Sequence, residues 1–169
     1  MAAELDEGFT GADLDRSVWF PYYLPHWSSR ATSAATYEIG EGELRLIIAD
    51  HQPLWCAERH AEPMRVSCLQ TGSYAGPIGS TVGQQPIPHG LTVSEEQPTF
   101  WGCTPHFGSL EVTMRGTVGP RSMIAFWLSG IEDTPERSGE ICVAEIFGEG
   151  SPTGWRRWVW VSIASATPP

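Results

Sequence analysis

Alternating hydrophobic and polar positions mark short strands along the chain. In residues 109–115, Leu110, Val112 and Met114 point to one face while polar side chains occupy the positions between them. A period of two predicts a strand with one buried face. Residues 122–129 are almost wholly apolar, which is typical of a strand covered on both faces.

The pattern also predicts a hairpin. Residues 43–49 alternate and follow the Gly-rich turn at 40–42, so we expect them to pair with residues 36–39. Residues 51–108 show no sustained period and are interpreted as short strands joined by long loops. With 18 Gly and 14 Pro punctuating the chain, helices have little room. The fold class predicted is an all-β sandwich or barrel.

The length and net charge of the chain disfavour several classes of function. A chain of 169 residues is long enough for one domain that buries about 70% of its unfolded surface. Twenty acidic against ten basic residues give a net charge of −10, which disfavours nucleic acid and anionic membranes as partners. No apolar run approaches the roughly 20 residues of a membrane span. No signal peptide is visible, so the chain as it stands is expected in the cytoplasm, while the location of the protein stays open.

Two carboxylates lie in the apolar segment 139–148. Strict alternation places Glu140 and Glu145 on opposite faces, because five is an odd offset. A β-bulge at Val143 or Ala144 repairs the pattern. The bulge gives one face the residues Glu140, Cys142, Glu145 and Phe147. The opposite, core-facing side then carries Ile141, Val143 and Ile146.

This spacing suits a pair of catalytic acids. With a bulge the two Glu backbones lie roughly 13–15 Å apart, and side chains that lean together approach the about 5–5.5 Å carboxyl separation of a retaining glycosidase. One carboxylate then acts as nucleophile and the other as general acid and base. The alternative is that Glu140 ends a strand and Glu145 points to solvent. Acids in an otherwise apolar strand are costly enough to favour the functional interpretation.

The segment EICVAE at residues 140–145 resembles the motif Glu-x-Asp-x-x-Glu of the family 16 glycoside hydrolases. The resemblance extends to LDEGFTGADLDRSVW at 5–19, FGSLEVTMR at 107–115 and AFWL at 125–128. It implies a concanavalin A-like jelly-roll sandwich of two antiparallel sheets. It also implies that Glu140 is the nucleophile and Glu145 the acid/base. Cys142 replaces the family's middle Asp, which orients the nucleophile.

Aromatic and histidine side chains are the candidate sugar contacts. The resemblance assigns Trp127 to the cleft beneath the sugar, and packing in the core is its alternative. Loop aromatics able to stack on sugar rings are Trp101, Tyr22, Tyr23, Trp27 and Trp55. We expect one or two of these five to contact sugar. His106 is a further candidate for the cleft, with a structural histidine as its alternative.

Cysteine and histidine offer two other kinds of site. A loop region contains the potential zinc ligands His51, Cys56, His60 and Cys68, but their spacing fits no zinc signature, so we predict no metal and no cofactor. Four cysteines allow two disulfides in three pairings: Cys56, Cys68, Cys103 and Cys142. A domain of this size does not require them, and the redox state stays open.

The end of the chain differs in character from the rest. Residues 154–160 contain three Trp and two Arg, a composition expected from codons read out of frame. We therefore expect a family-like domain over residues 1–153 and an atypical tail over 154–169, with the family's last strands missing. The alternative is a genuine strand that carries Trp158 and Trp160 on one face.

Together these observations predict an endo-acting, retaining glycoside hydrolase whose partner is a β-linked polysaccharide, such as a β-1,3 or mixed-linkage glucan. A non-catalytic, lectin-like carbohydrate-binding sandwich is the alternative, and an inactive gene fragment is a third.

Overall fold

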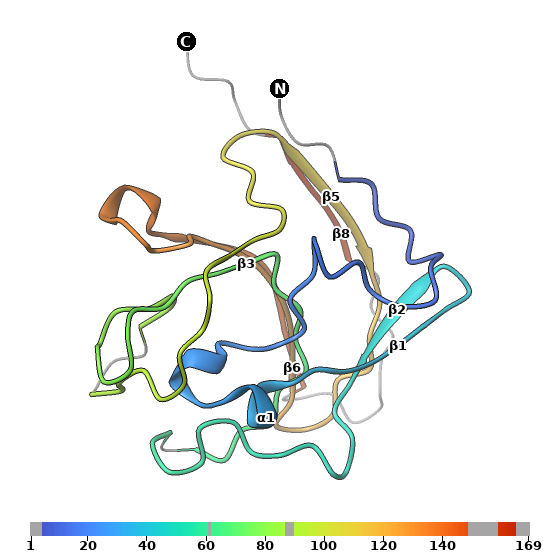
Figure 1. The fold of residues 1–169 in the computed structure, drawn as a ribbon. Helices are drawn as coiled ribbons and strands as arrows, with labels where there is room; N and C mark the ends of the chain where they lie inside the picture. The colour runs from blue at the N-terminus through green and yellow to red at the C-terminus, as the bar shows by residue number, and fades with distance from the viewer. Residues whose placement is uncertain (1–4, 61, 87–89, 149–158, 165–169) are drawn as a thin grey trace. The chain divides into compact units, whose positions relative to one another are not determined.

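The computed structural model describes residues 5–60, 62–86, 90–148 and 159–164, and these form antiparallel strands, short helical turns and long loops (Figure 1). The elements in chain order are η1 (Pro25–Trp27), α1 (Arg30–Ser33), β1 (Thr36–Gly40), β2 (Glu43–Ile47), β3 (Gly72–Ser73), β4 (Phe100–Trp101), β5 (Ser109–Met114), β6 (Met123–Ser129), η2 (Pro135–Arg137), β7 (Glu140–Phe147) and β8 (Val159–Ala164). The predicted all-β fold class is confirmed. Nowhere in the described part of the chain is a helix long and apolar enough to cross a membrane.

The chain folds into two compact units. The loop unit comprises Ala3–Thr104 and Ile131–Ser138, and contains β1 to β4 and the helical turns. The strand unit comprises Pro105–Gly130 and Gly139–Pro169, and contains β5 to β8. The boundary expected between residues 153 and 154 falls outside the described residues and stays a prediction.

The predicted hairpin is present in the loop unit. β1 and β2 pair antiparallel from Thr36↔Ile47 to Gly40↔Glu43. The two loop residues, Glu41 and Gly42, have φ angles of 55° and 72°, as a two-residue turn of the primed type requires. Leu46, on the apolar face of the pattern, is 46% exposed, so this face is not fully covered.

Aromatic residues from separate loops build the core of the loop unit. Its buried cluster consists of Leu24, Trp27, Trp55, Cys56, Leu91 and Val93. Each buried indole N–H has a backbone acceptor, since Trp27 donates to Gln84 O and Trp55 to Tyr23 O. Gln52 fills a similar role, because its amide donates to the carbonyls of Ala34 and Val66. Side-chain amides and indoles thus donate hydrogen bonds to backbone carbonyls of residues that lie outside the named strands.

His26 is buried beside this core, and its burial predicts a stability that depends on pH. Its ring lies tilted against that of Trp27, with 4.6 Å between the centroids, and its Nε2 lies 3.1 Å from Gln84 O. Burial lowers the pKa of His26 from 6.5 to about 4. A lowered histidine pKa gives stability that is complete above pH 6.5 and is lost as the pH falls towards 4, because the unfolded chain binds the proton first.

We expect the wild-type protein to lose about 2 kcal/mol of unfolding free energy through His26 between pH 7 and pH 5. Urea denaturation at both pH values measures this, with His26→Gln as the matched variant, whose stability should fall less. An equal loss in the two proteins contradicts the assignment to His26.

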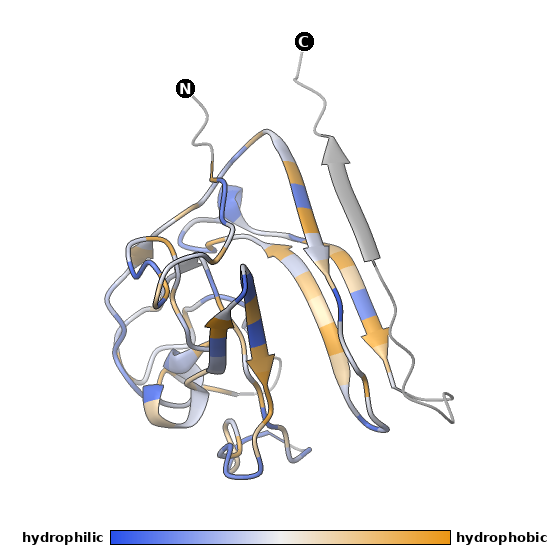
Figure 2. Ribbon diagram, turned by 90° about the vertical axis from the view of Figure 1, so that its right-hand side faces the viewer, coloured by the Kyte–Doolittle hydropathy of each residue, from blue (hydrophilic) through white to orange (hydrophobic). Residues whose placement is uncertain are grey.

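Longer strands form the strand unit, and β5 and β7 mix hydrophobic and hydrophilic residues along their length (Figure 2). In β5, exposed and half-buried residues alternate throughout, as the sequence predicts. β5 pairs antiparallel with β8, from Ser109↔Ala164 to Met114↔Val159. A strand over 159–164 is what the strand interpretation of this segment predicts, while residues 154–158 and 165–169 lie outside the described residues.

Candidate active-site face

The candidate site is built on β6 and β7, which pair antiparallel with one irregularity. Phe126 lies opposite Ala144 and the next residue, Trp127, lies opposite Cys142, so Val143 has no partner across the ladder. This is the β-bulge that the apolar pattern predicts, at one of the two positions expected for it. The bulge shifts every later residue of β7 by one position relative to strict alternation.

The bulge brings the two acids to one face. Glu140 lies opposite Ser129, Cys142 opposite Trp127, and Glu145 opposite Ala125. Residues directly opposite each other in an antiparallel pair point to the same side. The face therefore carries both carboxylates and the thiol between them, and we call it the acid face: Glu140, Cys142, Glu145, Ala125, Trp127 and Ser129.

Hydrogen bonds hold each carboxylate to β6. The indole Nε1–H of Trp127 donates to Glu145 Oε1 at 3.0 Å. The hydroxyl of Ser129 donates to Glu140 Oε2 at 3.3 Å. Nothing in the sequence predicts that Ser129 is a site residue, because only the strand register places it opposite Glu140.

Cys142 lies between the acids and is exposed. Desolvation raises the pKa of its thiol from the ordinary value of 9.0, and the charge of Glu145 and a hydrogen bond to it raise the pKa further. The Trp127 side chain opposes this through a hydrogen bond, and the charge of Glu140 adds a smaller upward effect. Cys142 is therefore a neutral thiol at neutral pH, whereas an Asp at this position carries a charge.

The strand also departs from the predicted pattern. Ile141 was expected on the core-facing side but is 54% exposed. Phe147, on the side of the acid face, is 62% exposed, and Met123 opposite it is 42% exposed. The acid face thus continues beyond Glu145 as an exposed apolar surface.

Two of the five loop aromatics considered as possible sugar contacts are buried. Trp27 is 1% exposed and Trp55 is fully buried, and both pack in the core of the loop unit. The prediction that Trp27 binds substrate is corrected on this basis, because a sugar ring cannot stack on an indole enclosed by protein. The sequence of a Gly-rich loop does not show whether its Trp side chains point into the core or toward solvent.

Other candidates are accessible. Trp101 is 51% exposed in the loop unit, with the guanidinium of Arg137 5.7 Å from its ring centroid. Tyr22 and Tyr23 are half-buried. His106 is exposed in the strand unit and stacks on Phe107 at 4.0 Å between centroids. A substrate role for Trp101, His106 and Trp127 stays a prediction.

The four potential zinc ligands of the loop region are not grouped in the structure. Cys56 Sγ donates to Trp27 O, and His60 Nδ1 lies 2.7 Å from Glu62 O. Burial raises the pKa of Cys68 to about 12. Among the described residues, no three His, Cys, Asp or Glu side chains are grouped to hold a metal ion. All four cysteines are free thiols.

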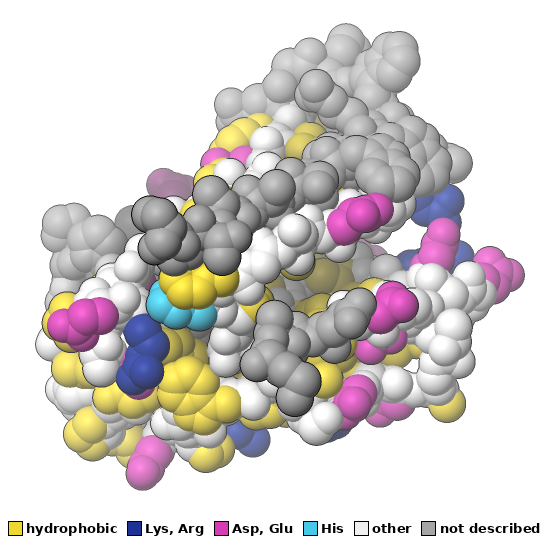
Figure 3. Space-filling view, turned by 90° about the horizontal axis from the view of Figure 1, so that it is seen from above, with side chains coloured by type: hydrophobic (Ala, Val, Ile, Leu, Met, Phe, Trp, Pro, Cys, Tyr) yellow, Lys and Arg dark blue, Asp and Glu magenta, His cyan; other side chains and the backbone are white. Residues whose placement is uncertain are grey.

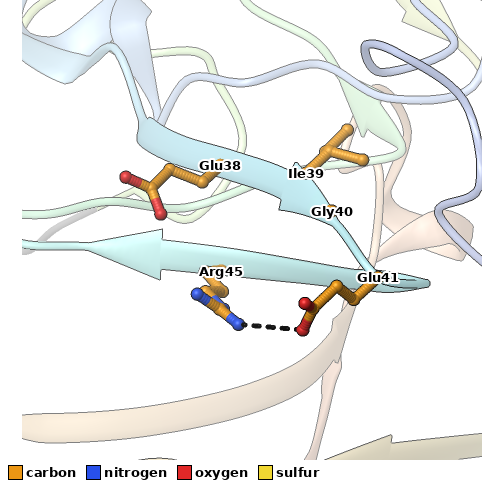
Figure 4. Close-up of a pocket in the computed structure, with 5 residues that line it drawn as sticks. All are labelled: Glu38, Ile39, Gly40, Glu41 and Arg45. Carbon is orange, nitrogen blue, oxygen red and sulfur yellow. Dashed lines mark ion pairs between the residues drawn. The ribbon is translucent and has the colours of Figure 1, made fainter.

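A pocket lies elsewhere, on the β1–β2 hairpin, where Glu38, Ile39 and Gly40 line it with Glu41 and Arg45 (Figure 4). Arg45 is 3.9 Å from Glu41 and 3.8 Å from Glu43. Exposed ion pairs of this kind contribute little to the stability of the fold. On the face seen in Figure 3, acidic side chains are dispersed among uncharged and hydrophobic ones. Neither feature forms a second charged site comparable to the acid face.

Comparison with known proteins identifies the fold. Neither a protein-family model nor a curated protein matches this sequence. Among solved structures, the chain is similar to a GlcNAcα1-4Gal releasing endo-β-galactosidase from Clostridium perfringens, with a TM-score of 0.67 and 23% identity. The match covers 98% of this chain and 44% of that chain, so this chain spans less than half the length of the enzyme. The fold is therefore one that occurs in a glycosidase, in agreement with the antiparallel jelly-roll sandwich predicted from the sequence.

Proposed function

We propose that the acid face is the catalytic face of a retaining, endo-acting glycoside hydrolase that cleaves a β-linked polysaccharide. The observation that carries the proposal is the bulge at Val143, which places Glu140 and Glu145 on one face of β7. The sequence motif around these residues resembles family 16, and the fold resembles that of a glycosidase. Glu140 is assigned as nucleophile and Glu145 as acid/base.

The first chemical step forms a glycosyl ester. A carboxylate oxygen of Glu140 attacks the anomeric carbon, and the bond from that carbon to the leaving oxygen breaks. Glu145 transfers its proton to the leaving oxygen, so that the departing sugar leaves as a neutral alcohol. Trp127 Nε1–H, 3.0 Å from Glu145 Oε1, keeps this carboxyl on the reacting side of the sheet.

The second step returns both carboxyls to their starting states. Glu145, now a carboxylate, takes a proton from a water molecule whose oxygen bonds to the anomeric carbon. The ester bond to Glu140 breaks and releases its carboxylate. Two inversions at the anomeric carbon give net retention of configuration.

The exposed apolar surface beyond Glu145 supplies a contact for sugar. Phe147 and Met123 lie directly opposite each other and belong to the same side of the sheet as Glu145. The apolar C–H face of a pyranose ring packs on aromatic side chains. We assign this pair to a sugar unit next to the scissile bond.

Replacement of Phe147 by Ala is therefore expected to raise KM about 10-fold, which corresponds to the loss of one aromatic contact. Because Phe147 is 62% exposed, thermal melting should change little. Ile141→Ala is the matched control, since Ile141 is also exposed, at 54%, but lies on the opposite side of β7. An equal rise in KM for both variants contradicts the assignment.

Hydrolysis assays test the proposal directly. The full chain is incubated with laminarin, mixed-linkage glucan and a β-galactan, the last because the similar solved structure is named as an endo-β-galactosidase. New reducing ends should appear first with the β anomer, as NMR spectroscopy of the fresh products records. Initial release of the α anomer excludes the double displacement, and the absence of cleavage in all three polysaccharides excludes the assigned activity.

A second function is favoured by Cys142. The middle position of the family 16 motif is an Asp, and a neutral thiol stands there in this chain. A sandwich that binds sugar without cleaving it retains the acid face but not turnover. Isothermal titration with laminarin oligosaccharides separates the two functions, because a lectin binds without producing reducing ends.

A further inference from the structure

Trp101 presents an indole ring at the surface of the loop unit. It belongs to β4 and lies opposite Gly72 of β3. The backbone directly after it is held in place, because the amides of Gly102 and Cys103 both donate to Thr71 O at 3.0 Å. The Trp101 side chain is 51% exposed. A fixed backbone thus holds an accessible aromatic ring.

The connection between β6 and β7 packs on the same side of this short ladder. Residues 131–138 follow β6 in the chain but belong to the loop unit. Ile131 is 7% exposed, and its Cδ1 lies 3.0 Å from the place that a Cβ on Gly72 would occupy. Residues opposite each other in an antiparallel pair point to one side. The connection therefore lies on the side of β3 and β4 to which Trp101 points.

Arg137, in η2 of this connection, faces the indole. Its Cζ lies over the Trp101 ring, 5.7 Å from the centroid. Its Nε donates to Asp133 Oδ1 at 2.6 Å, and its Nη2 donates to the other oxygen of the same carboxylate. Such a bidentate pair fixes the plane of the guanidinium. Asp133 is 15% exposed and Arg137 is 53% exposed, so the carboxylate is enclosed while the guanidinium reaches solvent.

The guanidinium retains donors that the ion pair does not use. Nε and Nη2 of Arg137 point to Asp133, and Nη1 carries two further N–H groups. No side chain or carbonyl in the described part of the chain accepts from Nη1. The group therefore combines an exposed aromatic surface with oriented donors at its edge.

This combination suits a neutral sugar ring. The C–H face of a pyranose packs on an indole, and the hydroxyls at the edge of the ring accept from a guanidinium N–H. A cationic ligand is disfavoured, because a guanidinium already faces the indole. An anionic sugar is disfavoured as well, because residues 131–138 contain three acidic residues and one Arg.

We propose that Trp101 and Arg137 bind a neutral pyranose unit of a polysaccharide, with Asp133 as the positioning residue for Arg137. All three residues belong to the loop unit, whereas the acid face belongs to the strand unit. The proposal rests on the proposed function only for the polymers chosen as probes, which are β-linked glucans and a β-galactan. The site contributes affinity for the polymer and takes no part in bond cleavage.

Affinity electrophoresis tests the site with the full chain, in gels that contain laminarin, mixed-linkage glucan or a β-galactan. Glu140→Gln serves as the background, so that the polymer is not cleaved. In this background Trp101→Ala and Arg137→Ala should each raise Kd about 3- to 10-fold, through loss of the aromatic contact or of the donor. Ile78→Ala is the matched control, because Ile78 is a 64% exposed apolar residue of the same unit. Its Kd should not change.

A double-mutant cycle tests the positioning role of Asp133. Asp133→Asn keeps the size of the side chain and should raise Kd while Arg137 is present. It should add nothing in the Arg137→Ala variant, because the orientation of the guanidinium is then irrelevant. A rise in Kd of equal size in both backgrounds would show that Asp133 supports only the fold of the loop, and it would contradict the positioning role.

Hydroxyl-radical oxidation, resolved by peptide mass spectrometry, locates the bound sugar. Oligosaccharides of the three polymers should slow oxidation of Trp101 and leave Trp19 unchanged as the internal control. Protection of Trp127 reports binding at the acid face and tests the proposed function separately. A gel that contains polygalacturonate, an anionic polymer, should leave the mobility unchanged. Retardation by this polymer that depends on Trp101 contradicts the assignment to neutral sugars.

The remaining outcomes separate the two proposals. The binding site is overturned if Trp101→Ala and Arg137→Ala leave Kd unchanged for all three polymers. It is also overturned if no oligosaccharide protects Trp101, or if the variants lower the melting temperature without changing Kd. Protection of Trp101 and a raised Kd, found together with no cleavage of any polymer, support this site and contradict the hydrolase proposal alone.

Discussion

Replacement of Glu140 by Gln is expected to abolish the proposed turnover of a polysaccharide, and replacement of Glu145 by Gln is expected to lower it about 10²- to 10⁴-fold. An amide at position 140 cannot form the glycosyl ester, and an amide at position 145 can neither give a proton to the leaving oxygen nor take one from water. Both changes preserve side-chain size, so the fold should be retained. Reducing-end release and circular dichroism measure the two properties.

An activated substrate distinguishes the roles of the two acids. A dinitrophenyl β-glycoside carries a leaving group that departs without protonation, so Glu145→Gln should still form the ester and release a burst of dinitrophenolate. Its glycosyl–enzyme should then accumulate and be visible by mass spectrometry, because no base activates the water. Glu140→Gln should give neither burst nor adduct. The reverse behaviour of the two variants contradicts the assignment of roles.

The matched control is Glu111→Gln. Glu111 is an exposed acid of the same strand unit, on β5, and belongs to no part of the acid face. Its replacement should leave kcat and KM unchanged. Loss of activity in all three variants would indicate a general response to lost charge, and it would contradict the proposal.

Truncation of Trp27 to Ala should cost about 3–5 kcal/mol of unfolding free energy. The side chain is 1% exposed, its ring lies tilted against that of His26, and it donates to Gln84 O at 3.0 Å, so its loss leaves a cavity and removes one donor from the Gln84 carbonyl. Most domains are stable by only about 5–15 kcal/mol. Urea denaturation of the full chain measures the loss.

Trp101→Ala provides the comparison. Trp101 is 51% exposed and contacts Arg137 through its ring face, so its removal should cost about 1 kcal/mol or less. A Trp27 variant that keeps its stability and loses affinity for sugar would restore the role that the sequence suggested for this residue. A large loss of stability in the Trp101 variant would show that exposure is a poor guide to packing in this loop unit.

The bulge at Val143 shows how much of the candidate site can be predicted from the sequence. Two acids five residues apart in an apolar strand violate alternation, and one extra residue at Val143 or Ala144 reconciles the acids with their apolar neighbours. The register shift opposite Phe126 and Trp127 confirms this. The alternation of hydrophobic and polar residues depends only on neighbours in the chain, so a break in the alternation can be detected from the sequence.

Contacts between side chains of different strands cannot be predicted from the sequence in this way. Ser129 reaches Glu140, and Trp127 reaches Glu145, only because β6 and β7 pair in one register. A shift by a single residue turns these side chains to the other face. The sequence therefore identified the acids, while the partners that hold them depend on the pairing of the two strands.

The sequence by itself determined the all-β class, the β1–β2 hairpin, the alternation of β5 and the bulge between the two acids. Only the tertiary structure decided that Trp27 and Trp55 belong to the core, that Ile141 and Phe147 are exposed, and that Trp127 pairs with Glu145. The physical reason is the range of the interactions. Periodicity and turn geometry arise between neighbours in the chain, whereas the burial of an aromatic ring in a long loop depends on segments far away in sequence that close over it.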